Sequence, residues 1–132
     1  MDKEILVEKA IDALKQYAYL HGKQFSLLMV SFGDGSTNDF FTLIVSAPWL
    51  NEMTIKKAIT FLLEIIKDGL SEDEVKEFMR ASSILTINTN DPLVQGITAP
   101  FRGAGTVLIY TNQMIINDEN LGRCIVYEAN NL

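Results

Sequence analysis

Two apolar runs, Phe25 to Phe32 (FSLLMVSF) and Phe40 to Ala47 (FFTLIVSA), decide the fold of this chain. Each run places apolar side chains on both alternating faces, which is typical of a central strand covered on at least part of both sides. The segment between the runs, Gly33 to Asp39 (GDGSTND), has the composition of a hairpin connection. The two runs therefore predict a hairpin at the centre of a packed sheet.

A helix is predicted on each side of this hairpin. Apolar residues recur at three- and four-residue spacing from Asp2 to about Leu20, and the pattern stops at Gly22, a residue that suits the turn after a helix. A second apolar stripe runs from Ile55 to Ile66, with Asn51 as its expected N-cap. The width of this stripe predicts that the second helix is the most buried one.

The rest of the chain alternates between helix and strand signals. Ser71 and Glu74 have the spacing of a capping box, which predicts a third helix, and Asp91 with Pro92 predicts a short fourth one. Strand patterns are found at residues 84–87, 107–110, 114–116 and 124–127. We expect one α+β domain over residues 1–132: a mostly antiparallel sheet of about five strands, ending in an antiparallel meander, with an N-terminal helix and a central helical segment packed mainly on one face.

Composition restricts the classes of partner. The chain has 132 residues, a length that suits a single domain with its own core, and its formal net charge is −6. Nucleic acids and anionic membranes attract proteins through Lys and Arg, so an acidic chain disfavours both and favours basic proteins. No apolar run reaches the roughly 18 residues of a membrane span, and the N-terminal residues do not resemble a signal peptide. The expected location is the cytoplasm.

No catalytic, cofactor or metal pattern is found in the sequence. His21 is the only histidine and Cys124 the only cysteine, so neither a two-histidine metal site nor a disulfide within the chain can form. The loop from Asp34 to Asp39 offers oxygen atoms that calcium accepts, but its spacing differs from that of a calcium-binding loop. We expect no catalytic residue, no cofactor and no metal.

Two groups of residues are the candidate partner-binding sites. Glu72, Asp73 and Glu77 supply acid at the start of the third helix beyond what capping needs, and this acid would steer a basic partner. Phe101 and Arg102 lie in the longest loop-like segment, where an aromatic ring beside a guanidinium would serve as a binding anchor.

Three interpretations follow. The first is a non-catalytic, acidic protein-binding domain, either an inhibitor such as an immunity protein or a chaperone for another, basic polypeptide. The alternative is a small-ligand-binding protein or enzyme, with Arg102, Asp34, Asp39 and Tyr110 near a cleft. A homodimer through an edge strand is compatible with either, since the segments near Met114 and Cys124 carry few charges.

Overall fold

The computed structural model describes residues 3–33, 40–101 and 106–130, and within this part the side chains of Phe101, Thr106 and Val107 are left undescribed. The elements are, in chain order, α1 (Lys3–Leu20), β1 (Leu27–Ser31), β2 (Phe41–Ser46), η1 (Pro48–Leu50), α2 (Ile55–Asp68), α3 (Glu72–Ala81), β3 (Ser82–Thr86), α4 (Pro92–Thr98), η2 (Ala99–Phe101), β4 (Thr106–Ile116) and β5 (Glu119–Ala129). The prediction of one α+β domain with a five-stranded, mostly antiparallel sheet is confirmed.

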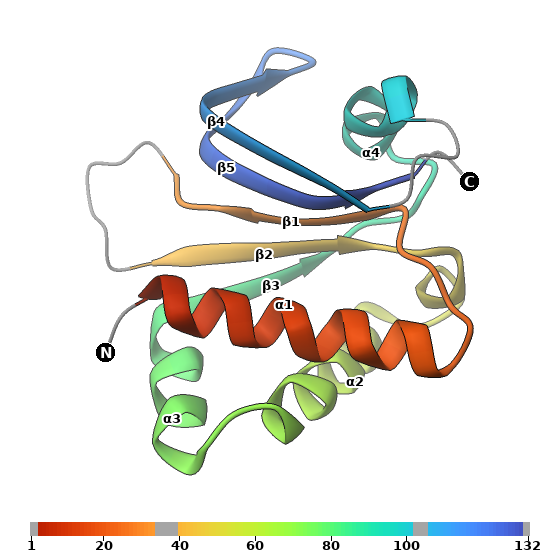
Figure 1. Ribbon diagram of the computed structural model, residues 1–132. Helices are drawn as coiled ribbons and strands as arrows, with labels where there is room; N and C mark the ends of the chain where they lie inside the picture. The colour runs from red at the N-terminus through yellow and green to blue at the C-terminus, as the bar shows by residue number, and fades with distance from the viewer. Residues whose placement is uncertain (1–2, 34–39, 102–105, 131–132) are drawn as a thin grey trace.

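The strands lie in the order β3-β2-β1-β5-β4, so the predicted hairpin of β1 and β2 does occupy the middle of the sheet (Figure 1). The expected C-terminal meander is wrong in one respect, because β3 pairs in parallel with β2. The α2 and α3 helices return the chain to the end of the sheet where β2 began, and a strand that starts there runs parallel to β2. β5 then pairs with β1, so β5 is an interior strand and not an edge.

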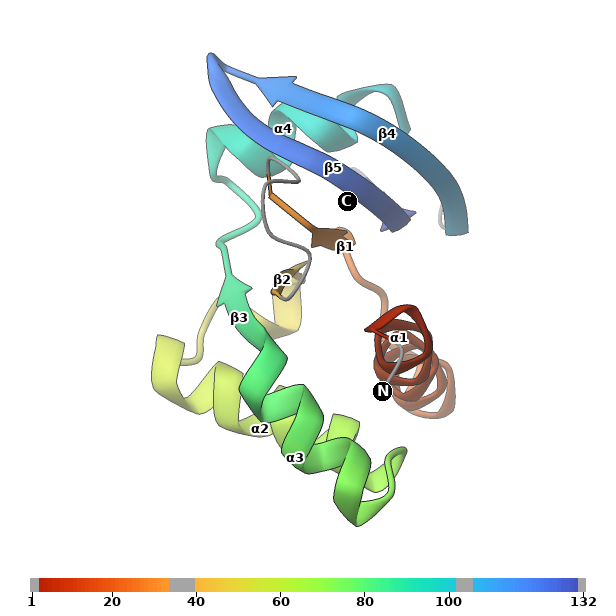
Figure 2. The ribbon, with the colours of Figure 1, turned by 90° about the vertical axis from the view of Figure 1, so that its left-hand side faces the viewer.

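The sheet has a hydrophobic core on each face. Leu28 and Val30 of β1 point toward α1, α2 and α3, while Leu27 and Met29 point toward α4. Each of these four residues is 0% exposed, as the apolar run predicted. Figure 2 shows α1, α2 and α3 below the sheet and α4 above it. The expectation that helices gather mainly on one face therefore holds for three of the four α-helices of the described chain.

The most buried helix is α1, not α2, which corrects the sequence prediction. α1 buries six residues and α2 buries three, namely Ala58, Leu62 and Ile66. The apolar stripe of α2 is wider than the surface that it covers, and Ile55 at its start is 69% exposed. A stripe shows which side of a helix faces inward, but how much of it is covered depends on the neighbouring elements.

The start of α2 also differs from the prediction. Thr54 is the N-cap, and its side-chain oxygen accepts a hydrogen bond from the Lys57 amide at 3.2 Å. Asn51 instead ties η1 to the segment after β3, because its side chain donates to Thr89 Oγ1 at 2.8 Å and accepts from the Thr89 amide at 3.1 Å. The expected cap at Asn51 is therefore wrong: Asn51 follows the η1 turn, and α2 begins after Thr54, whose hydroxyl also suits an N-cap.

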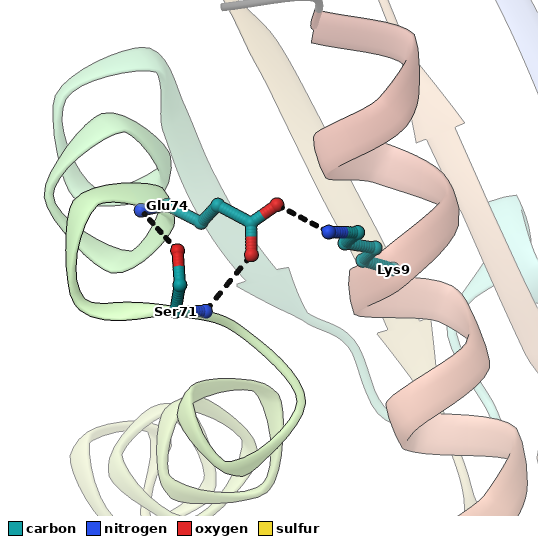
Figure 3. Close-up of polar contacts among 3 residues, drawn as sticks. All are labelled: Lys9, Ser71 and Glu74. Atoms are coloured by element: carbon teal, nitrogen blue, oxygen red, sulfur yellow. Dashed lines mark hydrogen bonds and ion pairs between the residues drawn. The ribbon is translucent and has the colours of Figure 1, made fainter.

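The capping box of α3 is confirmed and also joins α3 to α1. Ser71 Oγ accepts from the Glu74 amide at 3.2 Å, and a Glu74 carboxylate oxygen accepts from the Ser71 amide at 2.8 Å (Figure 3). The second carboxylate oxygen pairs with Lys9 Nζ of α1 at 2.5 Å. The ion pair with Lys9 and the bonds within the box lower the pKa of Glu74. One side chain therefore both starts α3 and holds it against α1.

The C-terminal hairpin is longer than the sequence suggested. The two strand patterns at 107–110 and 114–116 belong to one strand, β4, which is joined to β5 through a tight turn at Asn117 and Asp118. Both turn residues have positive φ, at 53° and 66°, which is the conformation that a two-residue hairpin turn requires and that Asn and Asp tolerate. The outcome is a ribbon of two eleven-residue strands, whose outer strand is β4.

Candidate functional site

A cleft lies between α1 and the β4–β5 ribbon on the three-helix face of the sheet. Its volume is about 280 Å³. We call it the α1–β5 cleft, and its lining residues are Glu4, Val7, Glu8, Phe32, Tyr110, Thr111, Asn112, Arg123, Cys124, Ile125 and Tyr127. The β4 residues among them place the cleft beside the edge of the sheet.

Local structure explains why these side chains meet. Glu4 and Glu8 are one helical turn apart on α1, so they share one side of the helix. Ile125 and Tyr127 alternate with buried residues of β5 and pack against the three-helix core, next to the cleft. Tyr110 pairs with Ile125 across the ribbon, which brings its side chain to the same face.

Two aromatic rings in the cleft contact positively charged side chains of the same chain. The Arg123 guanidinium lies 4.3 Å from the centroid of the Phe32 ring, and Lys3 Nζ lies 5.2 Å from the same centroid. Lys15 Nζ lies 5.8 Å from the centroid of the Tyr127 ring. These separations fall within the range of cation–π attraction. The Phe32 and Tyr127 rings of the cleft wall therefore each contact a cation of the chain itself.

The pKa of Tyr127 reports the electrostatic field in the cleft. Burial is the largest cause that raises the pKa of Tyr127 from 10.0 to about 12, and the neighbouring Tyr110 adds to the rise. The carboxylates of Glu8, Glu4 and Asp12 raise the pKa further, because a negative phenolate would be repelled by them. Negative charge is thus disfavoured at the Tyr127 hydroxyl.

The edge of the sheet next to the cleft is open. In the described part of the chain, β4 pairs with β5 alone, and its sequence (TVLIYTNQMII) contains no charged residue. Leu108 is 60% exposed and Tyr110 is 68% exposed. Edge strands are usually protected by charge, by proline, by a bulge or by short length. β4 is long and uncharged, and the irregularities in its pairing with β5 leave the strand continuous.

The two predicted groups of partner-binding residues lie on different elements, as far as the chain is described. Glu72, Asp73 and Glu77 lie on α3, and Glu77 pairs with Arg80 of the same helix, an interaction that lowers the pKa of Glu77. Phe101 ends η2, directly after α4 on the opposite face of the sheet (Figure 1). The side chain of Phe101, all of Arg102 and the Asp34 to Asp39 loop lie outside the described residues.

His21 and Cys124, the single histidine and cysteine of the sequence, make packing contacts. His21 follows the end of α1, where its ring stacks on Tyr17 with centroids 4.2 Å apart, and it is not among the residues that line the cleft. Cys124 is fully buried, and burial raises the pKa of its thiol, which disfavours the reactive thiolate. Among the described residues, no cluster of three His, Cys, Asp or Glu side chains could hold a metal ion, and no helix is long and apolar enough to cross a membrane.

The sequence pattern pointed to Tyr110 near a cleft and to the uncharged segment near Met114, but not to the other residues that line this cleft. The residues that it missed, Glu8, Phe32 and Tyr127, are far apart in the chain and meet only through the pairing of β5 with β1. The available signal was the absence of charge over eleven residues of β4 beside a turn, which marks an open edge. Comparison of the chain with protein-family models, curated proteins and solved structures finds no match.

Proposed function

We propose that the protein is a non-catalytic binding domain for another, basic polypeptide, which adds an extended segment to the edge of β4. The observation that carries the proposal is the long, uncharged edge with Leu108 and Tyr110 exposed on it. Strand addition supplies main-chain hydrogen bonds along such an edge, and neighbouring pockets give specificity through alternate side chains. An inhibitor and a chaperone would both use this mode of binding.

The charge of the protein favours a basic partner over a second copy of the chain. Two copies with a net charge of −6 each repel one another as they approach, whereas a basic polypeptide is attracted. Glu72 and Asp73 of α3 add to this long-range attraction without touching the β4 edge. If a second copy bound the same edge instead, sedimentation of the purified protein would show a dimer.

Native pulldown with mass spectrometry tests the proposal when it compares two variants. Leu108→Lys places a charge on the β4 edge, and Leu85→Lys places the same charge on β3, the opposite edge, where Leu85 is 46% exposed. We expect a basic protein to copurify with the wild type and with Leu85→Lys, and to be lost with Leu108→Lys. Equal retention by both variants would contradict the proposal.

The cleft favours one second candidate, a small-ligand-binding protein. Its volume of about 280 Å³ lies just below the usual range of ligand pockets, and Tyr110, one of the residues expected near such a site, lines it. A small molecule that raises the midpoint of thermal unfolding distinguishes this candidate. For a ligand in the cleft, Tyr110→Ala would abolish the rise and Leu108→Lys would leave it unchanged.

A further inference from the structure

The α1–β5 cleft is placed to receive a side chain from a strand added at β4. Side chains on one face of a sheet alternate along each strand, so alternate residues of the added strand would lie beside Leu108 and Tyr110. The cleft begins at Tyr110 and continues to Tyr127 on β5. Neighbouring strands are about 4.8 Å apart, and β4 would lie between the added strand and β5, so the added strand would be two spacings from β5. Only a long side chain would reach the interior of the cleft.

The charges around the cleft are arranged unequally. The positive groups of Arg123 and Lys3 are both held against the ring of Phe32, and that of Lys15 lies over the ring of Tyr127. The carboxylates of Glu4, Glu8 and Asp12 repeat at four-residue spacing along α1, and all three act on the Tyr127 hydroxyl. Three cations thus face three carboxylates, but the cations lie over the rings, whereas the carboxylates are the charged groups that act on the Tyr127 hydroxyl. Glu8 lines the cleft together with the two tyrosines, so the hydroxyl end of the cleft suits a cation.

We propose that the α1–β5 cleft binds the lysine or arginine side chain of the partner strand, with the charged group between the Glu8 carboxylate and the Tyr127 and Tyr110 hydroxyls. This inference rests on the proposed function, because the added strand delivers the side chain. The apolar stem of the side chain would lie along the Tyr110 ring, as long basic side chains commonly do on apolar surfaces. Specificity for a basic partner would then come from one position of the strand and not from net charge alone.

A set of synthetic peptides tests the inference. The host is an acetylated peptide of alternating threonine and valine with one central guest position, which is lysine, arginine, norleucine or glutamate. Binding is measured as changes in the amide NMR signals of β4, with the wild type and with Glu8→Gln. The matched control is Glu64→Gln, which removes an exposed carboxylate of α2 that is not among the residues lining the cleft.

We expect lysine and arginine guests to bind the wild type about five to ten times more tightly than norleucine, and glutamate to bind least, as for a partly exposed charge pair worth about 1 kcal/mol. Glu8→Gln should remove most of the difference between lysine and norleucine, and Glu64→Gln should preserve it. If all guests shift β4 equally, strand addition stands and the cleft inference is overturned. If no guest shifts β4, both are overturned.

Discussion

Tyr127 is the residue whose ionisation best reports the cleft. Its pKa is raised from 10.0 in the unfolded chain to about 12 in the folded protein, so its neutral form is retained while the unfolded chain ionises. The stability that this raised pKa contributes is fully present below pH 10 and is lost as the pH rises from 10 to 12. We expect Tyr127→Phe to lose less stability than the wild type across this window, measured by urea unfolding.

Tyr19→Phe is the control for this measurement, since Tyr19 is 86% exposed on α1. It should leave the alkaline loss of stability unchanged. A loss of equal size in Tyr127→Phe and in the wild type would show that the Tyr127 hydroxyl is not held in a buried, negative environment.

Glu128 gives a second prediction for a single residue, with its pH window at the acidic end. Burial is the largest effect on this carboxyl and raises its pKa above 4.5, and its Oε2 atom has no hydrogen-bond partner in the described structure. Its contribution to stability is fully present below pH 4.5 and is lost as the pH rises through the folded pKa. We expect Glu128→Gln to be more stable than the wild type at pH 7 and equal to it near pH 4. A Gln variant that is less stable at pH 7 would mean that the charged form is stabilised, for instance by Lys15.

At the scale of elements, truncation of Leu62 tests how much the packing of α2 contributes to the stability of the core. Leu62 is 0% exposed, so Leu62→Ala should lower the free energy of unfolding by about 2–5 kcal/mol, as truncation of large core side chains does. Ile55→Ala in the same helix, at an exposed position, should cost much less. Denaturant unfolding of both variants checks the prediction, and a loss below about half a kcal/mol for Leu62→Ala would place α2 outside the core.

Elements that depend on local sequence could be predicted, and their long-range arrangement could not. The capping box at Ser71, the Asp91 cap and the two-sided burial of β1 follow from neighbouring residues and from alternation. The parallel pairing of β3 with β2 and the placement of β5 between β1 and β4 are contacts between distant segments. The cleft depends on those contacts, so the sequence pointed to an open edge but not to the residues beside it.

At the scale of the whole molecule, charge and edge should control different steps of binding. Glu72→Lys combined with Glu77→Lys on α3 should slow association, and more so at low salt, because salt screens steering between exposed charges. If the Phe101 ring contacts the partner, Phe101→Ala should shorten the lifetime of the complex equally at low and high salt, because salt does not screen apolar contacts. Surface plasmon resonance at two salt concentrations separates these effects, and a salt-independent loss in the charge variant would argue against steering.

Hydrogen exchange of the β4 backbone amides, measured with and without the copurified partner, tests the central claim most directly. Strand addition converts the outward-facing amides of Thr106–Ile116 from solvent-exposed groups to hydrogen-bonded ones. We predict that exchange along β4 slows on binding, while exchange along β3, the other edge, is unchanged. Slower exchange confined to α3, β3 or other elements, with β4 unaffected, would contradict strand addition at this edge.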